Sequence, residues 1–483
     1  MSASTPHPHH AAVPPGSGAL FFIQTFATLG FAVLYSTLVL YATKRLGFSE
    51  SQANAMMGIF GAFNYGLHLF GGYLGGRYLS NRNLFVMGMV LQVIGCYLIA
   101  EMGITGLYWG LAMFLTGSGL NVTCLNMMLT QRFAPDDHRR ESAFLWNYAG
   151  MNLGFFMGFS VAGYFQLTED YRTLFLFATL GNVLAIIATL FFWPILADIN
   201  TPLRHIKGRG FYLRMLGGLA ILAMLVPALR LLLTHASFSG SFVLMLGAVV
   251  LVLLCVMTAR HPDAAERNRM VAYLILALGS LIFWSLYQLA PMGLMLFSEH
   301  NINLTVFGLR VAPQWILNIN TIVIVIGGPL MALLFKRLRE QGWNIDIPSQ
   351  FAASLFCMGL GMLVLPIGIH LAGADGLVAF KWIAIGYAMI GKLAPASLQG
   401  LMMGCWMMVT GVASVLAGYV SSAMPQNIGS SPVATNPGYS SVFNMLGWGS
   451  MAGGVVLLLL VPRLRQLIAS KIAPQPAATA IPV

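Results

Sequence analysis

His68 is the one histidine of this sequence that stands in the middle of a long apolar segment, the stretch from about residue 51 to 75. With an unperturbed pKa of roughly 6.5, a histidine can take up and release a proton near neutral pH. Titratable groups inside membrane segments are costly, and many of them form proton relays. The alternative is a neutral imidazole hydrogen-bonded to a nearby backbone or side-chain group. His68 is therefore a proton-coupling candidate, with the structural interpretation left open beside it.

All 14 aspartates and glutamates fall in tails, loops or segment ends, and none lies in the middle of an apolar segment. An enzyme needs nucleophilic and proton-transferring groups together in one polar cavity. The five cysteines show no paired spacing typical of a disulfide or a zinc site. The sequence therefore predicts no catalytic residues, no metal site, no cofactor and no enzyme.

Neutral amides and aromatic rings make up the remaining binding candidates. They suit a small solute held by hydrogen bonds and ring stacking. The alternative for each ring is helix packing or a place in the aromatic belt of the membrane surface, and for Trp146 we prefer that alternative. The substrate-binding candidates are Tyr65, Tyr148, Asn152, Trp284, Gln288, Asn320 and Trp406.

Asp137, Arg139 and Arg140 form a charged group just before the segment that begins near residue 142. One interpretation is a cytoplasmic gate, in which charge pairs break and form again as two halves of a transporter rock. The other is the ordinary excess of basic residues on the cytoplasmic side of a membrane.

The elements that must carry these residues are membrane helices. Of the 483 residues, 58% are hydrophobic and 8% are charged, against roughly 25% charged in a soluble domain. A membrane segment must bond its own backbone, which predicts helices, and the alternation of β-barrel strands is not seen. Fourteen apolar segments are long enough to cross a bilayer: about 18–42, 51–75, 83–101, 105–131, 142–166, 171–195, 210–233, 239–258, 269–298, 313–337, 349–371, 377–393, 397–424 and 438–462.

The basic residues predict the orientation. With the N-terminus inside, 19 of the 25 lysines and arginines fall on the cytoplasmic side and 6 on the other. The net charge of +11 then reflects topology, so we expect a lipid bilayer and no nucleic acid as a partner. Residues 1–17 lack the pattern of a signal peptide and are expected to be a disordered tail. Both termini are predicted to be cytoplasmic.

One stretch of sequence indicates a protein family more specifically than the composition does. It begins at Lys392-Leu393-Ala394-Pro395, continues through Gln399 to Trp406, and is followed by Leu416-Ala417-Gly418. This string resembles the proton-coupled oligopeptide transporter (POT) family of the major facilitator superfamily. Further stretches that resemble the family are Gly71 to Arg77, Gly117 to Gly119, Asp137 to Gly154, Phe283 to Phe297, and Gly308 to Asn320.

The resemblance implies an all-α polytopic membrane protein with the major facilitator fold. That fold has two six-helix bundles with a substrate site between them near the midplane, and bacterial members of the family are known for an inserted two-helix hairpin. We expect an N-terminal tail at 1–17, bundles at 18–199 and 269–465, a linker and inserted transmembrane hairpin at 200–268, and a C-terminal tail at 466–483.

The departures from the family bear on mechanism. Phe21, Gln24 and Thr25 stand where family members carry Glu-x-x-Glu-Arg in the first helix, a motif used in proton coupling. Other positions where family residues have been replaced are Thr28, Leu29, Ala32, Gly76, Val122, Ala379 and Gln288. The lost carboxylates held protons and faced the amino end of a peptide, and the lost basic residues faced its carboxylate. Both ends of the charge clamp are therefore missing, and the substrate need not be a zwitterionic peptide.

We expect a secondary transporter of the bacterial inner membrane that moves a small solute, a dipeptide, tripeptide or peptide-like compound, by alternating access. The family implies coupling to protons, and the sequence lacks the Gly-rich motif of an ATP site. One alternative is a facilitator, or a transporter of a non-peptide metabolite. Another is a membrane sensor or partner subunit that binds a ligand without transporting it.

Overall fold

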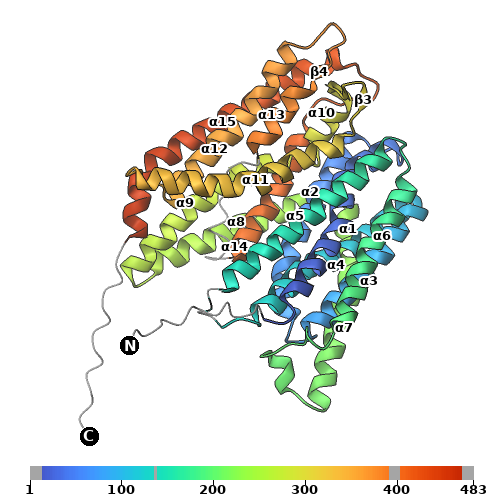
Figure 1. Cartoon of the computed structure of the whole chain (residues 1–483), viewed down its shortest axis with the longest axis vertical. Coiled ribbons are helices and arrows are strands. Elements are labelled where there is room, and N and C mark those ends of the chain that lie inside the picture. The colour runs from blue at the N-terminus through green and yellow to red at the C-terminus, as the bar shows by residue number, and fades with distance from the viewer. Residues whose placement is uncertain (1–13, 135–136, 138, 391–402, 470–483) are drawn as a thin grey trace, which may run out of the picture. The chain divides into compact units, whose positions relative to one another are not determined.

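Most of the described part of the chain is helical (Figure 1). The computed structural model describes residues 14–134, 137, 139–390 and 403–469, without the side chains of residues 332 and 403–406. The described helices are α1 (Ser17–Lys44), α2 (Glu50–Leu74), α3 (Asn81–Glu101), α4 (Gly103–Thr130), α5 (Arg139–Gln166), α6 (Tyr171–Phe191), α7 (Arg209–Thr234), α8 (Ala236–Arg260), α9 (Ala264–Tyr287), α10 (Gly293–Asn301), α11 (Pro313–Glu340), α12 (Ile347–His370), α13 (Phe380–Ile390), α14 (Met403–Ser422) and α15 (Pro432–Ile468).

Short elements complete the described secondary structure. A 3-10 helix, η1 (Pro202–His205), precedes α7. Strand β1 (Ile302–Asn303) pairs in parallel with β4 (Val378–Ala379), placing Ile302 opposite Val378. Strands β2 (Thr305–Val306) and β3 (Leu309–Arg310) form a second two-stranded pair.

Polar side chains at the helix starts explain where several helices begin. The first backbone N–H groups of a helix have no partner within it, and a serine or aspartate just before the helix can accept from them. Ser80 caps α3, Asp170 caps α6, Asp263 caps α9, Asp346 caps α12 and Ser431 caps α15.

Each of the fourteen predicted segments contains a helix, but the segment expected at 269–298 is two helices. Helix α9 ends at Tyr287, a turn covers 288–292, and α10 starts at Gly293. Pro291 lies in this turn and has no N–H with which to continue the helical ladder. The expectation of one continuous helix was therefore wrong at this point.

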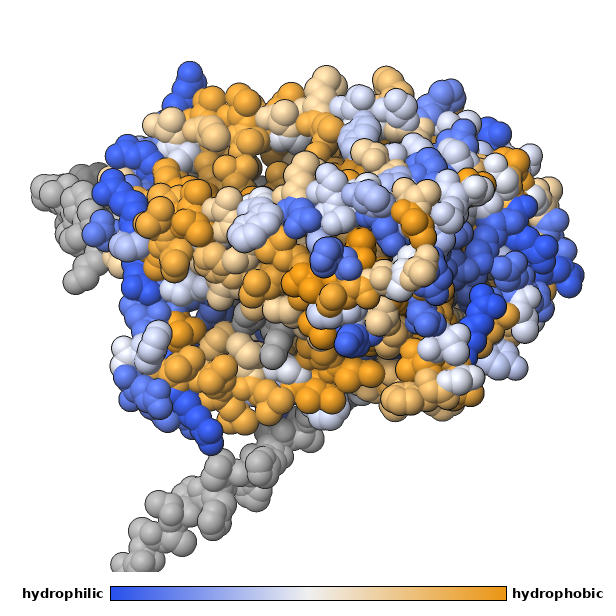
Figure 2. All heavy atoms as spheres, turned by 90° about the horizontal axis from the view of Figure 1, so that it is seen from above, coloured by the Kyte–Doolittle hydropathy of each residue, from blue (hydrophilic) through white to orange (hydrophobic). Residues whose placement is uncertain are grey.

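Ten helices of the described residues are long and apolar enough to cross a membrane. Helices α2 and α5, with 25 and 28 residues, have the length but fall short in apolarity. Both carry amide side chains along their length, among them Asn64 and Asn152. Figure 2 shows apolar side chains over much of the visible surface, with hydrophilic patches between them. An exterior of this kind needs lipid around it, so the chain is an integral membrane protein with the predicted all-α fold.

The chain divides into two compact units. Unit 1 comprises 1–48, 63–236 and 310–321, and unit 2 comprises 49–62, 237–309 and 322–483. Helices α2 and α11 therefore each contribute one part to each unit. The division into bundles at 18–199 and 269–465 with a separate inserted hairpin stays a prediction.

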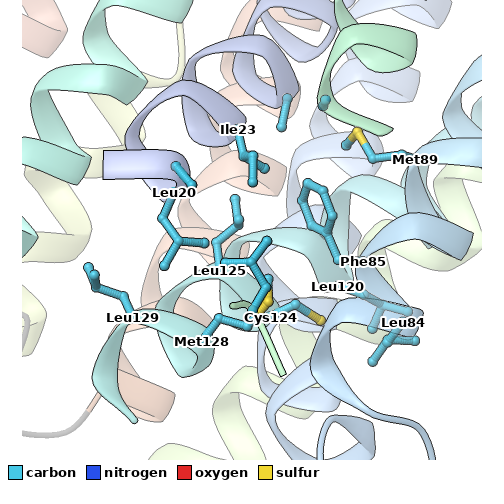
Figure 3. Close-up of a cluster of buried hydrophobic side chains, with 14 of the residues drawn as sticks. Leu20, Ile23, Leu84, Phe85, Met89, Leu120, Cys124, Leu125, Met128 and Leu129 are labelled. Carbon is cyan, nitrogen blue, oxygen red and sulfur yellow. The ribbon is translucent and has the colours of Figure 1, made fainter. Parts of the chain in front are cut away.

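The core of unit 1 joins α1, α3 and α4. Figure 3 shows Leu20 and Ile23 of α1 near Phe85 of α3 and Leu125 of α4, and all four are buried in one apolar cluster. Helices α3 and α4 pack without side chains between them at one point, because a Cβ added to Gly117 would lie 2.1 Å from the carbonyl oxygen of Gly88. Small residues allow this close approach in membrane helices.

Unit 2 has an aromatic core and a buried polar network beside it. Phe297 of α10 packs against Tyr439 and Phe443 of α15, with ring centroids 4.9 and 5.0 Å away. The buried Glu50 at the start of α2 accepts from the backbone N–H of Asn427 at 3.0 Å, and Asn427 Nδ2 contacts the Tyr439 hydroxyl. This network fixes the start of α2 to the loop that leads into α15.

Asp346 is expected to stabilise unit 2 at neutral pH. Its carboxylate caps α12 through Ser349 and pairs with Arg465 of α15. Burial raises the pKa of Asp346, but the hydrogen bonds from Arg465 and Ser349 outweigh it and hold the pKa below its usual range. The stabilisation is therefore present above the usual aspartate pKa and is lost as the pH falls through the lowered value. Asp346→Ala should cost about 1–2 kcal/mol at pH 7, measured by thermal unfolding.

The matched control is Asp375→Ala, which removes a carboxylate that accepts only a local N–H, from Leu377. Its unfolding midpoint should stay close to that of the wild type. The difference between Asp346→Ala and the wild type should shrink as the pH is lowered from 7 towards 3. A difference that is the same at both ends of this range contradicts the role of the charged carboxylate.

Candidate functional site

The α1 positions at which the family carries charge hold a neutral, locally satisfied network. Gln24 Nε2 donates to Thr28 Oγ1 at 2.9 Å, and the Thr28 hydroxyl donates to the Gln24 carbonyl at 2.8 Å. The Thr25 hydroxyl donates to the Phe21 carbonyl at 2.9 Å. Gln24, Thr25 and Thr28 are all buried. Hydrogen-bonded neutral groups avoid the cost of burying ions here. The polar side chains at the replaced positions therefore already have hydrogen-bond partners.

Helix α5 extends this network. Asn147 Nδ2 lies 3.4 Å from Gln24 Oε1 and links α5 to α1. One turn further on, Asn152 Nδ2 donates to the Tyr148 carbonyl at 2.9 Å, so these two candidates share one face of the helix. Asn152 is buried, whereas Tyr148 is 41% exposed. The exposed ring can reach a solute, and the buried amide holds the backbone beneath it.

Trp146 is 65% exposed, and its ring meets that of Phe21 edge-on at 6.1 Å. This packing agrees with the structural interpretation of Trp146 rather than with a binding role.

His68 lies buried on α2, within a small polar group. Its Nδ1 contacts the Asn64 carbonyl oxygen, and Thr123 of α4 donates to the His68 carbonyl at 2.6 Å. The ring of Tyr65 lies 5.9 Å from the imidazole, centroid to centroid. Since a carbonyl oxygen only accepts, Nδ1 must carry a hydrogen, which leaves Nε2 as the nitrogen that can take up a proton. The hydrogen bond at Nδ1 fits the structural interpretation of His68. Proton relay through Nε2 remains compatible with the same arrangement.

The first turns of α11 bind to α5 within unit 1, a contact that the sequence did not predict. Gln314 Nε2 donates to Gln166 Oε1 at 2.9 Å, and the Trp315 indole donates to the Ser160 carbonyl at 3.0 Å. Asn318 Nδ2 donates to Ser160 Oγ at 3.0 Å. The candidate Asn320 lies on the same stretch of α11 and is also buried. Amides in otherwise apolar segments were the signal that could have identified this contact.

In unit 2, Trp284 and Gln288 lie together at the end of α9. The Gln288 backbone N–H donates to the Trp284 carbonyl at 2.9 Å, and Gln288 is almost fully buried. The Trp284 ring packs edge-on against Tyr287 at 5.4 Å. Trp406 belongs to α14, but its side chain is outside the described part of the chain, as is the string from Lys392 to Met402.

The charged group expected before the fifth segment lies at the start of α5, with Arg139 and Arg140 inside the helix, and it forms a local pair. Arg139 Nη2 lies 2.7 Å from Asp137 Oδ2, and the Arg139 backbone N–H donates to Asp137 Oδ1 at 2.9 Å. The Arg140 guanidinium lies 5.9 Å from the centre of the Phe144 ring. Asp137 thus binds the first turn of α5, where a negative charge is favourable.

Comparison with known proteins agrees with this helical architecture. A family model described as PTR2, POT family, matches residues 82–376. Dipeptide and tripeptide permease B of Salmonella typhimurium is 26% identical over 471 residues, covering 93% of this chain and 95% of that protein.

Two solved structures share the fold. A peptide transporter POT in complex with sulfate is 24% identical with a TM-score of 0.80, covering 96% of this chain and 98% of its own. A POT family transporter in complex with 5-aminolevulinic acid is 20% identical with a TM-score of 0.78, covering 95% and 98%. The family model covers more than half of the sequence and includes the whole of α5, α9 and α11, which carry several of the site candidates. This chain therefore belongs to the POT family.

Proposed function

We propose that the chain is a secondary transporter that moves a dipeptide, tripeptide or peptide-like solute by alternating access. Membership of the POT family and the similarity to dipeptide and tripeptide permeases over nearly the whole chain support this proposal. The protein would work in the inner membrane of a bacterial cell with both termini in the cytoplasm, in accordance with the distribution of basic residues.

The neutral network at Gln24, Thr25 and Thr28 carries the proposal about substrate class. Because these groups bond within α1 and carry no charge, the solute must be held by hydrogen bonds and stacking from other residues, not by a pair of opposite charges. The proposed binding residues are Tyr65, Tyr148, Asn152, Trp284, Gln288, Asn320 and Trp406. A non-peptide metabolite is the second candidate, favoured by the lost charge clamp and by the relative bound to 5-aminolevulinic acid.

His68 is the proposed proton-coupling residue, acting through Nε2 while Nδ1 stays bonded to the Asn64 carbonyl. A facilitator, in which no residue couples uptake to protons, is the alternative. Asp137, Arg139 and Arg140 are the proposed cytoplasmic gate. The Asp137–Arg139 pair is local, so gating requires these side chains to exchange it for pairs with the other half as the halves rock. A sensor that binds its ligand without transport is the remaining alternative.

Reconstituted protein should accumulate labelled dialanine, or another component of a metabolite mixture, when an inward proton gradient is applied. Uptake is followed by radioactivity for dialanine and by mass spectrometry for the mixture. His68→Gln should lose at least about tenfold of the gradient-driven accumulation, because the amide cannot carry the proton, while exchange without a gradient continues.

His205→Gln is the matched control, since His205 is exposed on η1, and its uptake should equal that of the wild type. Full gradient-driven uptake by His68→Gln rules out the relay. Wild-type uptake that does not depend on the proton gradient identifies a facilitator. Ligand binding without any uptake by folded protein identifies a sensor and refutes the transporter.

A further inference from the structure

A basic pocket lies at the end of α2 in unit 1, and none of the candidates for substrate binding lines it. It has a volume of about 380 Å³ and is lined by Tyr73, Arg77, Tyr78, Pro202 and Arg214. These residues come from the last turn of α2, the α2–α3 turn, η1 and α7. Helix α7 packs directly on the turn, since a Cβ added to Gly218 would lie 3.0 Å from Leu79. The pocket therefore has walls from several separate elements.

Most of the guanidinium N–H donors of Arg77 and Arg214 make no hydrogen bond within the described part of the chain. The Arg77 guanidinium lies over the Tyr73 ring, 5.1 Å from its centre, which fixes it at the pocket wall. Arg214 Nη1 makes one long contact of 3.4 Å, to the Arg77 carbonyl oxygen. A guanidinium has five N–H donors. Within the described ranges, neither arginine forms an ion pair with a carboxylate.

An acidic side chain at position 76, next to Arg77, would be strained. Gly76, which precedes Arg77, has a φ of 74°, and a Cβ there would meet Thr201 at 2.8 Å. Asp198, which lies shortly before η1 in the sequence, accepts from the backbone N–H and Nδ2 of Asn81 at 3.1 and 3.0 Å. The positive charge of the pocket is thus left without a protein counter-charge on the elements that line it.

We propose that this pocket binds a phosphate oxyanion, that of an anionic phospholipid headgroup. Arginine forks match phosphate geometry and bind it with strong, charge-assisted hydrogen bonds. Basic pockets beside membrane helices are suited to anionic headgroups, and tyrosines such as Tyr73 and Tyr78 are typical of the membrane surface, where such headgroups lie. The bound headgroup holds α7 against the α2–α3 turn.

The test uses the purified full-length protein in a neutral detergent, titrated with phosphatidylglycerol, phosphatidylcholine or inorganic phosphate while thermal unfolding is followed. Phosphatidylglycerol should raise the unfolding midpoint saturably and phosphatidylcholine should not. Arg214→Gln should weaken the apparent affinity for phosphatidylglycerol by about tenfold. Arg77→Gln with Arg214→Gln should reduce the response to that seen with phosphatidylcholine.

The control is Arg260→Gln with Arg267→Gln, which removes the same charge from two exposed arginines outside the pocket and should respond as the wild type does. An unchanged response of the Arg77 and Arg214 double variant overturns the site. If inorganic phosphate protects as well as phosphatidylglycerol at equal concentration, the lipid assignment is wrong. Should the double variant fold poorly, Arg214→Gln alone decides, because Arg214 is exposed and its one protein contact is long.

Discussion

Replacing Gln24 by glutamate is expected to destabilise the protein by up to about 2.5–3.5 kcal/mol at pH 8, the cost of an unpaired ion buried within a membrane segment. Gln24 is buried, donates to Thr28 through Nε2 and lies within reach of Asn147 through Oε1. A carboxylate only accepts, so the donor to Thr28 Oγ1 is lost together with neutrality. The protonated acid has a donor and an acceptor as the amide does, so the loss should be far smaller at pH 5.

The comparison is made by thermal unfolding of variant and wild type at both pH values. Gln341→Glu is the control, because Gln341 is exposed at the end of α11 and tolerates a charge. An equally small effect of Gln24→Glu at pH 8 would falsify the proposal of a neutral network, since it would mean that water or a cation reaches this position. The result therefore bears directly on whether the lost charge clamp has been replaced by hydrogen bonds.

The helices could be predicted because the signal for each one lies in a single continuous stretch of sequence. An apolar run of about 20 residues has to bond its own backbone in lipid, which leaves a helix as its structure. The break between α9 and α10 was missed for the same reason, as the run from 269 to 298 stays apolar across the turn. Pro291 was the local signal of this helix break, which a hydropathy profile does not detect.

The candidate site could be predicted only in part, because contacts between helices depend on how each is rotated. The substitutions at Gln24 and Thr25 are visible in the sequence, but the contact from Asn147 spans 123 positions. The Gln166–Gln314 pair spans 148 positions and was not foreseen. Local contacts were easier: the structural alternative for His68 required a nearby group, and the Asn64 carbonyl, one turn away, is that group.

Gly154→Ala is expected to move α5, which carries the proposed binding residues Tyr148 and Asn152, away from α1. A Cβ at Gly154 of α5 would lie 2.5 Å from the Thr25 carbonyl oxygen and 2.7 Å from the Thr28 Cβ, both on α1. Backbone cannot move aside as a side-chain tip can, so α5 must shift. Overpacking of this kind costs about 1–3 kcal/mol, and the shift displaces Tyr148 and Asn152. We expect a lower unfolding midpoint and a loss of uptake of at least about tenfold.

Gly66→Ala separates this steric effect from the general effect of replacing a helical glycine. Gly66 lies on α2, and an added Cβ there meets nothing within 4 Å. Alanine is the better helix former, so this variant should be as stable as the wild type or slightly more stable. If Gly154→Ala behaves like Gly66→Ala in both unfolding and uptake, the close packing of α1 and α5 does not position the site. If only uptake falls, the helices adapt at little cost, and the loss measures how closely Tyr148 and Asn152 must be placed.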